Sequence, residues 1–444
     1  YIIILVVVIL SFILIIYIFF GPLPSQSKFV KDDELQYLDN NIQEDIQIRG
    51  AINMAQSDNN TSVIIGETTA ISTNKGSGNI ILGYQAGNIN TTGAQNIFIG
   101  DNSGSKNTTG NGNTYTGVKS GQNGTIGSNN SYYGLQSGMF ASGTGNVYMG
   151  YSSGMGVSTA LNSGTSNTFV GYSSGQNNFT GYSNTFFGNE AGKANTTGYQ
   201  NVYIGNASGN AASTAHDCVI IGNQAGTFNT ASENVFVGSY TGINNQTGEF
   251  NAFLGFNAGS ANTSGTSNTF IGNYAGASVT SKDNNTHIGA AAGTNNSGEQ
   301  NTFIGTNAGY GTNNLGTTKA TGSYNTTLGY NTGTAITGVS GTGGNSNTLI
   351  GYNAGSTITT GNNNTFLGNS AGNSIIAGSN NLILGATATG YTDINDQFYV
   401  NKSIVPVTTT SATPYYILGY DPASGKIVPL AAGSTVVGVP TQNP

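Results

Sequence analysis

A nine-residue motif repeated at a short, nearly fixed period constrains the fold of this chain more than any other feature. A clear copy is Asn301-Thr302-Phe303-Ile304-Gly305-Thr306-Asn307-Ala308-Gly309, and close copies recur from about Ser62 to Gly385. We take the first glycine of each copy as its reference glycine. The nineteen copies are spaced by 17 residues twelve times, by 16 residues three times, and by 21, 22 and 24 residues once each. Such a period with occasional insertions is typical of a solenoid, in which each unit stacks only on its neighbours. The reference glycines are Gly66, Gly83, Gly100, Gly117, Gly134, Gly150, Gly171, Gly188, Gly205, Gly222, Gly238, Gly255, Gly272, Gly289, Gly305, Gly329, Gly351, Gly368 and Gly385.

Each position of the repeat has its own chemistry. Asparagine stands four residues before the reference glycine in seventeen of the nineteen copies, and the exceptions are Ser62 and Cys218. Asparagines at one level of a stacked β structure can bond to one another as a ladder of side-chain amides. A β-branched or small residue, an aromatic residue and an aliphatic residue follow, which predicts a short strand.

Glycines mark the corners of the unit. A second glycine lies four residues after the reference glycine in every copy except the first and the last, and Ala, Ser or Thr precedes it. A third glycine often follows about ten residues after the first. Glycine at fixed points fits corners that need a positive φ or a close backbone approach. In the copy quoted above, the structural residues are therefore Asn301, Phe303, Ile304, Gly305, Ala308 and Gly309.

The length of the repeat decides between β architectures. Seventeen residues suffice for one turn of a narrow parallel β coil and are too few for a βαβ unit, which needs about 30. We therefore predict an all-β fold, a parallel β-solenoid of about nineteen 17-residue coils over residues 61–390. With strands about 4.8 Å apart, eighteen steps between coils give a rod roughly 85 Å long.

The strand positions predict how the rod meets its surroundings. Side chains alternate across a strand, so the aliphatic residue shares a face with the residue two before it, and the aromatic residue points the other way. We expect the aliphatic face inside the coil and the aromatic column outside, where a continuous apolar stripe marks an interaction surface. The simplest partner is the chain itself, as a parallel homotrimer. In the alternative arrangement the aromatic residues fill the interior, the aliphatic residues are half exposed, and the solenoid is a monomer. The candidates for the trimer interface are Phe169, Phe186, Tyr203, Phe236, Phe253, Phe270, Phe303 and Phe366.

Composition excludes several classes of protein. Only 7% of the residues are charged, Trp is absent and Gly numbers 68, which is unlike an ordinary enzyme domain. The glycines follow no Gly-X-Y period, so the chain is not a collagen. The net charge of −7 would repel a phosphate backbone, so we expect no nucleic-acid partner.

The first twenty residues form an uninterrupted apolar run that ends at Gly21-Pro22-Leu23-Pro24. As a helix, this run spans about 30 Å, the thickness of the hydrocarbon core of a bilayer. We predict that residues 1–20 are a transmembrane anchor in a lipid bilayer. A secretory signal would have an apolar core of about 7–15 residues and a small-residue cleavage site, and a buried helix would need a globular partner. Residues 21–60 are predicted to be a stalk or linker, either helical with about one heptad of coiled-coil spacing or simply solvated.

After Gly385 the period stops, and residues 391–444 are predicted to form a small β cap or tip. Asp421-Pro422-Ala423-Ser424-Gly425 lies between two apolar runs, which predicts a hairpin with a type I turn. A cap would cover the unpaired backbone groups at the end of a parallel stack. A tip would contact a receptor, and one segment can do both.

The copy Asn347-Thr348-Leu349-Ile350-Gly351-Tyr352-Asn353-Ala354-Gly355 resembles the Asn-Thr-Phe-Ile-Gly-Tyr-Asn-Ala-Gly arrays of fibre proteins from large DNA viruses and of phage-tail-fibre-like proteins. The repeat also resembles the head repeats of trimeric autotransporter adhesins, whose units carry small residues and an aliphatic-Gly step before a tight corner. The resemblance covers about three quarters of the chain. It implies a trimeric β-solenoid fibre that mediates attachment. The adhesin family has a C-terminal membrane β-barrel, whereas the anchor predicted here is N-terminal, which favours the viral or phage-like fibre.

Residues typical of catalysis or of metal binding form no pattern. His216 and His287 fall at different positions of the repeat, and neither has a Cys or carboxylate partner at ligand spacing. Cys218 is the only cysteine and replaces a ladder asparagine. We therefore nominate no catalytic, cofactor-binding or metal-binding residue and expect no cofactor. Sequons in the turn region, candidates for glycan attachment on a secreted rod, begin at Asn90, Asn107 and Asn195.

Three functions are consistent with the sequence. The first is a membrane-anchored structural fibre that projects from a virion or cell surface and attaches to a surface receptor or glycan through its tip or flank. The second is a purely structural spacer or assembly element of an envelope or capsid. The third, a polysaccharide-cleaving enzyme like the tailspikes, is disfavoured because those enzymes hold carboxylate pairs in grooves on longer coils. We expect the first, a fibre that is not an enzyme.

Overall fold

The computed structural model describes the repeat region and little else. The described residues are 63–65, 76–157, 161–311, 321–336, 343–386, 395–396, 398–400, 417–421 and 426–430. The chain divides into two compact units, residues 1–54 and 55–444, and all the described residues belong to the second. The predicted anchor at residues 1–20 and the predicted stalk at residues 21–60 lie outside the described residues. Among the residues that are described, no helix has the length and apolarity needed to cross a membrane.

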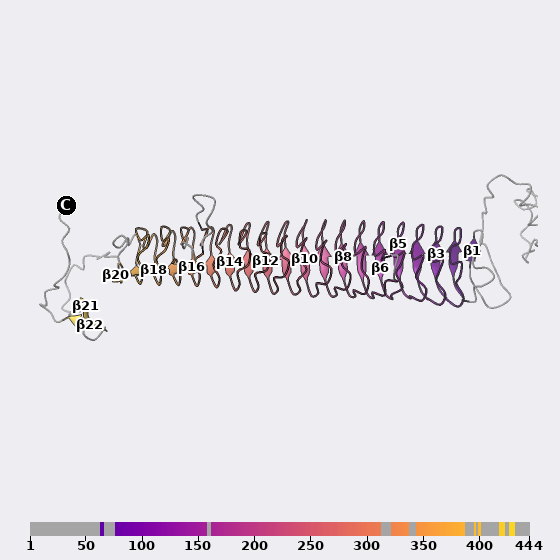
Figure 1. The fold of residues 1–444 in the computed structure, drawn as a ribbon, viewed down its shortest axis with the longest axis horizontal. Helices are drawn as coiled ribbons and strands as arrows, with labels where there is room; N and C mark the ends of the chain where they lie inside the picture. Colours follow the sequence, from indigo (N-terminus) through magenta and orange to yellow (C-terminus); the bar gives the residue numbers. More distant parts are fainter. Residues whose placement is uncertain are drawn as a thin grey trace, which may run out of the picture. The chain divides into compact units, whose positions relative to one another are not determined.

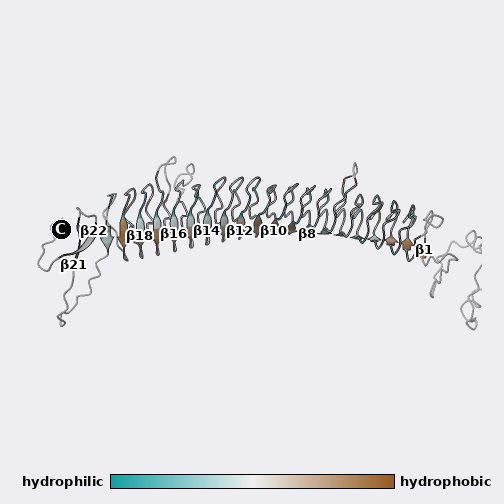
Figure 2. Ribbon diagram, turned by 90° about the horizontal axis from the view of Figure 1, so that it is seen from below, coloured by the Kyte–Doolittle hydropathy of each residue, from teal (hydrophilic) through white to brown (hydrophobic). Residues whose placement is uncertain are grey.

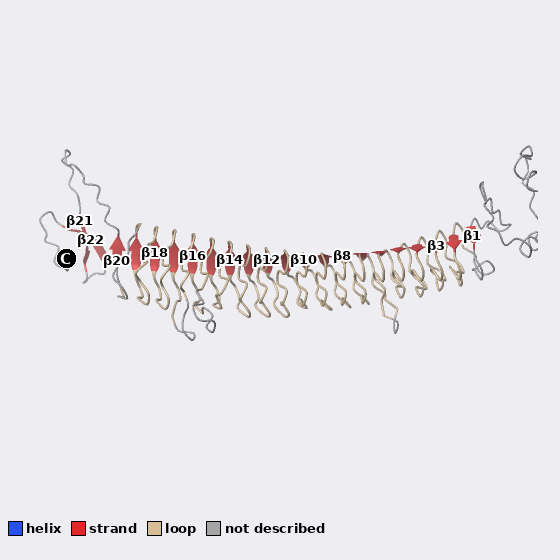
Figure 3. Cartoon of the chain, turned by 90° about the horizontal axis from the view of Figure 1, so that it is seen from above, coloured by secondary structure: helices blue, strands red, loops and turns tan. Residues whose placement is uncertain are grey.

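The repeats build one continuous parallel sheet. Strands β1 to β20 form a 20-stranded sheet in which each strand pairs with the next one along the chain (Figure 1). The register joins equivalent positions, so that Phe253 lies opposite Phe270. The strands line one side of the stack, and the loops project from the other side (Figure 3). The strands are β1 (Val63–Ile65), β2 (Ile80–Leu82), β3 (Ile97–Ile99), β4 (Thr114–Thr116), β5 (Ser131–Tyr133), β6 (Val147–Met149), β7 (Thr168–Val170), β8 (Thr185–Phe187), β9 (Val202–Ile204), β10 (Val219–Ile221), β11 (Val235–Val237), β12 (Ala252–Leu254), β13 (Thr269–Ile271), β14 (Thr286–Ile288), β15 (Thr302–Ile304), β16 (Thr326–Leu328), β17 (Thr348–Ile350), β18 (Thr365–Leu367), β19 (Leu382–Leu384), β20 (Phe398–Val400), β21 (Ile417–Asp421) and β22 (Lys426–Leu430).

The prediction of an all-β parallel solenoid with one strand per repeat is confirmed. The described stack amounts to about 17 coils. About nineteen were predicted, and parts of the first and last copies lie outside the described residues. The sheet also continues past the last reference glycine, because β20 pairs in parallel with β19. That copy has no glycine after its strand, so the glycine series does not detect it. Farther along, β21 and β22 pair antiparallel, as expected of the two apolar runs.

The centre of each strand faces the inside of the coil. In every strand from β2 to β19 the middle residue is buried and its two neighbours face outward at least in part. The prediction that the aromatic column faces outward is therefore wrong, and the alternative arrangement, with aromatic residues inside and half-exposed aliphatic residues outside, is the one observed. Because these rings are no more than 1% exposed in a single chain, they are not available to a partner. The residues concerned are Phe169, Phe186, Tyr203, Phe236, Phe253, Phe270, Phe303 and Phe366.

The second glycine of each repeat explains why the rings lie inside. A Cβ atom built on Gly104 would lie 2.8 Å from the ring of Phe98, so the ring occupies the space that a side chain there would need. Gly104 also has a φ of 56°, which few residues with a side chain adopt. The small residue before it, Ser103, is buried as well. The ring therefore fills the one part of the coil that two small positions leave open.

Successive rings stack along the interior. The rings of Phe169 and Phe186 lie 4.7 Å apart with an angle of 7° between their planes. Similar stacks run from Phe98 to Tyr203 and from Phe236 to Phe303. Figure 2 shows apolar colouring concentrated on the strands, whereas most loops are pale or hydrophilic.

The predicted asparagine ladder is confirmed. Asn184 donates its side-chain amide to Asn167 Oδ1 at 3.1 Å and to the carbonyl oxygen of Gly198 at 2.8 Å. Its backbone N–H donates to the same Asn167 oxygen at 3.0 Å. Asn201 repeats this arrangement on Asn184. Each rung therefore joins neighbouring coils and also closes its own coil across the interior.

A second asparagine ladder lies seven residues after the reference glycine, and the sequence reasoning missed it. Asn107 donates to Asn90 Oδ1 at 2.8 Å, and Asn195 donates to Asn178 Oδ1 at 2.8 Å. Asn90, Asn107 and Asn195 are the first residues of the three sequons, and they are at most 1% exposed. A glycan cannot be accommodated on these amides in the folded coil, so the sequons serve the ladder instead.

Candidate interaction surface

The outward side of the sheet presents a long column of mostly apolar side chains. We call it the sheet face and define it by the last residue of each strand from β2 to β19. These residues are apolar except for Thr116, and none of them is buried, with exposure reaching 56% at Phe187. The sheet face consists of Leu82, Ile99, Thr116, Tyr133, Met149, Val170, Phe187, Ile204, Ile221, Val237, Leu254, Ile271, Ile288, Ile304, Leu328, Ile350, Leu367 and Leu384.

The first residue of each strand widens this column without adding charge. From β2 to β19 that residue is Ile, Val, Leu, Ala, Thr or Ser. At the corner after the reference glycine, exposed aromatic residues add further apolar surface. Tyr151 stacks on Tyr172 at 5.2 Å, and Tyr330 stacks on Tyr352 at 5.4 Å. Apolar surfaces of this length are typical of interaction sites, which makes the sheet face a candidate.

The reference glycines fix the geometry of the sheet face. A Cβ atom on Gly188, whose φ is 145°, would collide with the carbonyl group of Gly205 in the next coil. Only glycine therefore permits the close stacking that keeps each strand in register with the next. The sheet face is consequently a regular row in which each coil contributes one side chain, and all of these side chains except Thr116 are apolar.

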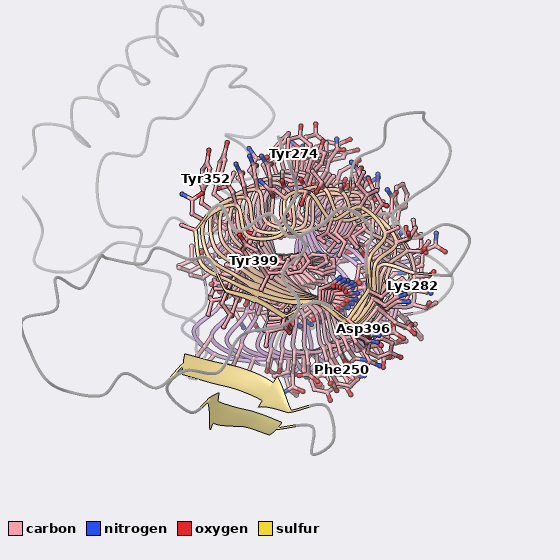
Figure 4. All side chains as sticks on the ribbon, turned by 90° about the vertical axis from the view of Figure 1, so that its left-hand side faces the viewer. Phe250, Tyr274, Lys282, Tyr352, Asp396 and Tyr399 are labelled. Atoms are coloured by element: carbon pink, nitrogen blue, oxygen red, sulfur yellow. The ribbon has the colours of Figure 1, made fainter. Side chains whose placement is uncertain are left out.

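Two of the residues predicted to be structural lie on the opposite face from the one expected, because Phe303 is inside the coil and Ile304 is outside. Asn301 accepts the backbone N–H of Asn325 at 2.9 Å, Gly305 has a φ of 130° and Gly309 a φ of 57°. Phe303 and Ala308 are buried in the interior, and Ile304 belongs to the sheet face. Figure 4 looks along the stack and shows Tyr399 inside the coil, whereas Phe250, Tyr274, Lys282 and Tyr352 project outward.

His287 occupies a ring position, as its place in the repeat predicts. It stacks between Phe270 at 4.8 Å and Phe303 at 4.9 Å and is fully buried. Neither ring nitrogen has a hydrogen-bond partner among the described residues. Burial lowers the pKa of His287 to about 3, so the ring is neutral at ordinary pH.

Cys218 interrupts the first ladder, and its side chain is buried. Its backbone N–H still donates to Asn201 Oδ1 at 3.0 Å, and its thiol lies 3.4 Å from the carbonyl oxygen of Ala231. Asn234, the next residue of this ladder, donates instead to Asn229 of the second ladder at 3.2 Å. Burial is the main reason that the pKa of Cys218 is raised to about 11, so the thiol stays protonated at neutral pH and is a poor nucleophile.

The remaining histidine lies on the surface. His216 Nδ1 is 3.0 Å from Asp217 Oδ2, and its ring stacks on Tyr199 at 4.7 Å. In the described part of the chain, no three or more His, Cys, Asp or Glu side chains group closely enough to hold a metal ion. The sheet face is thus the most extensive candidate for function that these residues offer.

Comparison with known proteins adds nothing to this assignment. No protein-family model, no curated protein and no solved structure matches the chain. The likeness to viral, phage and adhesin fibres therefore rests on the repeat motif alone.

Proposed function

We propose that the chain is a structural fibre protein whose solenoid associates with other copies of itself through the sheet face. Residues 1–20 anchor it in a membrane, the solenoid projects from a virion or cell surface, and its flank or the C-terminal tip attaches to a receptor or glycan. The observation that carries this proposal is the uncharged column from Leu82 to Leu384, in which Thr116 is the one residue that is not apolar.

The energy available at the sheet face favours association. Covering roughly 50 Å² of apolar surface in each coil would contribute about 1 kcal/mol per coil. The contribution repeats with every coil, so a partner of matching period gains far more than a short segment would. A second copy of the chain has the same period, because its sequence is the same.

A parallel trimer is the simplest closed form. Each strand of the solenoid is only three residues long, or about 10 Å wide. Three such narrow sheets can face one axis with every sheet face covered, and closed rotational symmetry leaves no free copy of the surface. The interface we propose therefore consists of aliphatic side chains such as Leu254 and Leu328, and the buried rings support the coil from within.

The mass of the full chain in micelles of a detergent without a sugar headgroup tests the proposal. Light scattering, with the detergent mass subtracted, should give three times the 45.3 kDa of one chain. Leu254→Glu together with Leu328→Glu should reduce that mass to a single chain, because carboxylates resist burial in an apolar interface. Tyr274→Glu is the matched control, since Tyr274 is as exposed as Leu328, at 45%, and lies outside the sheet face.

A monomer at micromolar concentration would contradict self-association. The sheet face would then serve the alternative function, a spacer that binds other envelope or capsid proteins along its length. Recovery of such proteins with the wild-type chain and not with the double Glu variant would favour that alternative.

A further inference from the structure

A cleft of about 510 Å³ opens on the surface of the solenoid, and none of the residues that line it belongs to the sheet face. Its walls come from four repeats and include Lys282, Ser297, Thr321, Tyr324 and Asn345. The volume falls in the range of about 300–1,000 Å³ that is usual for small-ligand sites. The cleft lies where the two longest repeats follow one another, with 24 residues from Gly305 to Gly329 and 22 from Gly329 to Gly351.

Backbone hydrogen bonds hold the floor of the cleft rigid. Ser323 Oγ accepts the N–H of Glu299 at 3.1 Å, and Asn345 Oδ1 accepts the N–H of Ser323 at 2.8 Å. The N–H of Ser346 donates to the carbonyl oxygen of Ser323 at 3.0 Å. The positions of these polar groups are therefore fixed before any ligand arrives, which lowers the entropy cost of binding.

Two hydroxyl groups in the cleft lack partners. Ser297 Oγ and Thr321 Oγ1 are both inaccessible to solvent, and neither makes a hydrogen bond within the described part of the chain. A buried hydroxyl without a partner is costly. Both residues line the cleft, so a hydroxylated ligand can supply the missing bonds when these side chains turn toward the opening.

Tyr324 gives the cleft an apolar wall. Its φ is 61°, and its side chain is 53% exposed. At the same position of other repeats Ser, Asn or Gln is common, and these polar residues need no burial. The positive φ recurs at this position along the solenoid, with 57° at Phe250, so the feature particular to the cleft is the ring of Tyr324 and not its backbone. An exposed ring beside fixed hydroxyls can stack on the C–H face of a sugar.

The charges at the cleft favour a neutral ligand. Lys282 Nζ lies 3.9 Å from Glu299 Oε2, so a donor and an acceptor stand side by side. Asp283, the residue after Lys282, does not line the cleft, and its Oδ1 accepts the backbone N–H of Thr266 at 2.8 Å. The Lys282–Glu299 pair offers an acidic sugar no net positive charge, whereas the hydroxyls of a neutral sugar can bond to both members of the pair.

We propose that this cleft binds a neutral sugar unit of a glycan, with Tyr324 stacking on the ring and Lys282, Ser297 and Thr321 bonding to its hydroxyls. This inference deepens the attachment part of the proposed function and rests on it. It does not depend on self-association, because none of these residues belongs to the sheet face.

Saturation-transfer NMR on the full chain in detergent micelles tests the site with glucose, galactose, mannose and N-acetylglucosamine as probes. At least one of these sugars should bind, and Tyr324→Ala and Lys282→Ala should each weaken its binding tenfold or more. Phe250→Ala is the matched control and should bind unchanged. Phe250 has the same position in its repeat, a φ of 57° and 56% exposure, but does not line the cleft.

Three outcomes would overturn the proposal: no neutral sugar binds, the Tyr324 and Lys282 variants bind as well as the wild type, or N-acetylneuraminic acid alone binds. The mass of each preparation is measured in parallel. A trimer that binds no sugar would reject the cleft alone, and a monomer that binds sugar through Tyr324 would reject self-association alone.

Discussion

The solenoid fills its interior in two ways, and the boundary between them lies near β16. From β3 to β15 most coils hold an aromatic ring at the centre of the strand, and several of them have asparagine seven residues after the reference glycine. From β16 to β19 the strand centres are Thr327, Leu349, Phe366 and Ile383. In this second region Ile336, Ile358 and Ile375 replace the second-ladder asparagines.

In most coils the shape of the central side chain and the hydrogen bonding beside it change together, although Phe270 shares its coil with Val279 and Phe366 shares its coil with Ile375. In the first region a flat ring leaves room beside it for a row of amides that bond to one another. In the second region branched aliphatic side chains pack against each other, with Ile336, Leu349, Ile358 and Phe366 in one cluster. A residue moved from one region to the other would break either the packing or the hydrogen bonds.

The largest expected effect comes from the second glycine. Gly242 and Gly333 have φ values of 54° and 59°, and a Cβ atom on either would lie 2.8 Å from a neighbouring side chain. At Gly242 that neighbour is the ring of Phe236, which is held at 5.0 Å from Phe253, whereas at Gly333 it is the end of the flexible Ile336. Gly242→Ala should lower the free energy of local unfolding by about 4 kcal/mol, and Gly333→Ala by about 2 kcal/mol.

Hydrogen exchange followed by mass spectrometry, read separately for the two regions of the full chain, measures both losses. Solenoid coils open locally, so each substitution should act mainly on its own and adjacent coils. Equal losses at the two sites would show that the rings move as freely as the aliphatic side chains, contrary to the contrast drawn here.

A reciprocal exchange of Asn and Ile should give a smaller effect. Ile358→Asn buries an amide between Ile336 and Ile375, where no neighbouring asparagine can pair with it, and should cost roughly 3 kcal/mol. Asn245→Ile removes the bonds to Asn229 and from Asn262 and adds apolar burial, so the loss should be about 1–2 kcal/mol. Hydrogen exchange followed by mass spectrometry checks both substitutions. A larger loss for Asn245→Ile would mean that the asparagine ladder stabilises its coils more than the aliphatic packing does.

The sequence is sufficient to predict most of the fold. The 17-residue period requires one coil per repeat, and asparagine four residues before the reference glycine predicts the ladder that Asn184 and Asn201 form. Alternation along the strand shows only that rings and aliphatic residues lie on opposite faces, and the choice of the inner face needs a further constraint. That constraint was present in the repeat, since the small residue and glycine after the corner are the only positions that leave room for a ring.

Other features depended on information that the repeat pattern conceals. Asn107-Thr108-Thr109 matches a sequon, and its role in a ladder becomes visible only when the coils are stacked. Strand β20 lacks the glycine that marks the other copies. The cleft combines Lys282 with Tyr324, which are 42 residues apart in the sequence and line one cleft only when the coils are stacked.

The smallest expected effect concerns the polar residues that occupy ring positions, one in each region. His287 stacks among the rings of the first region and Thr327 lies at the start of the second, and both have buried polar atoms without partners among the described residues. Only His287 titrates. Burial holds the pKa of His287 at about 3, below the usual value of about 6.5. Between these two pH values the imidazole therefore binds a proton in the unfolded chain and not in the folded chain. Above pH 6.5 the protonation of this residue does not lower the free energy of unfolding. As the pH drops toward 3 that free energy falls, and the loss is about 2 kcal/mol at pH 5.

His287→Phe should abolish that part of the acid sensitivity and complete the stack from Phe270 to Phe303. Thermal unfolding of the full chain by circular dichroism at pH 7 and pH 5 measures the change. The wild type should lose more stability between the two pH values than the variant, whereas Thr327→Val should stabilise the chain equally at both. His216→Gln controls for the exposed histidine and should leave the acid sensitivity in place. An unchanged pH dependence in His287→Phe would mean that protons reach His287 within the folded coil, and the ring stack would then be less closed to water than its burial indicates.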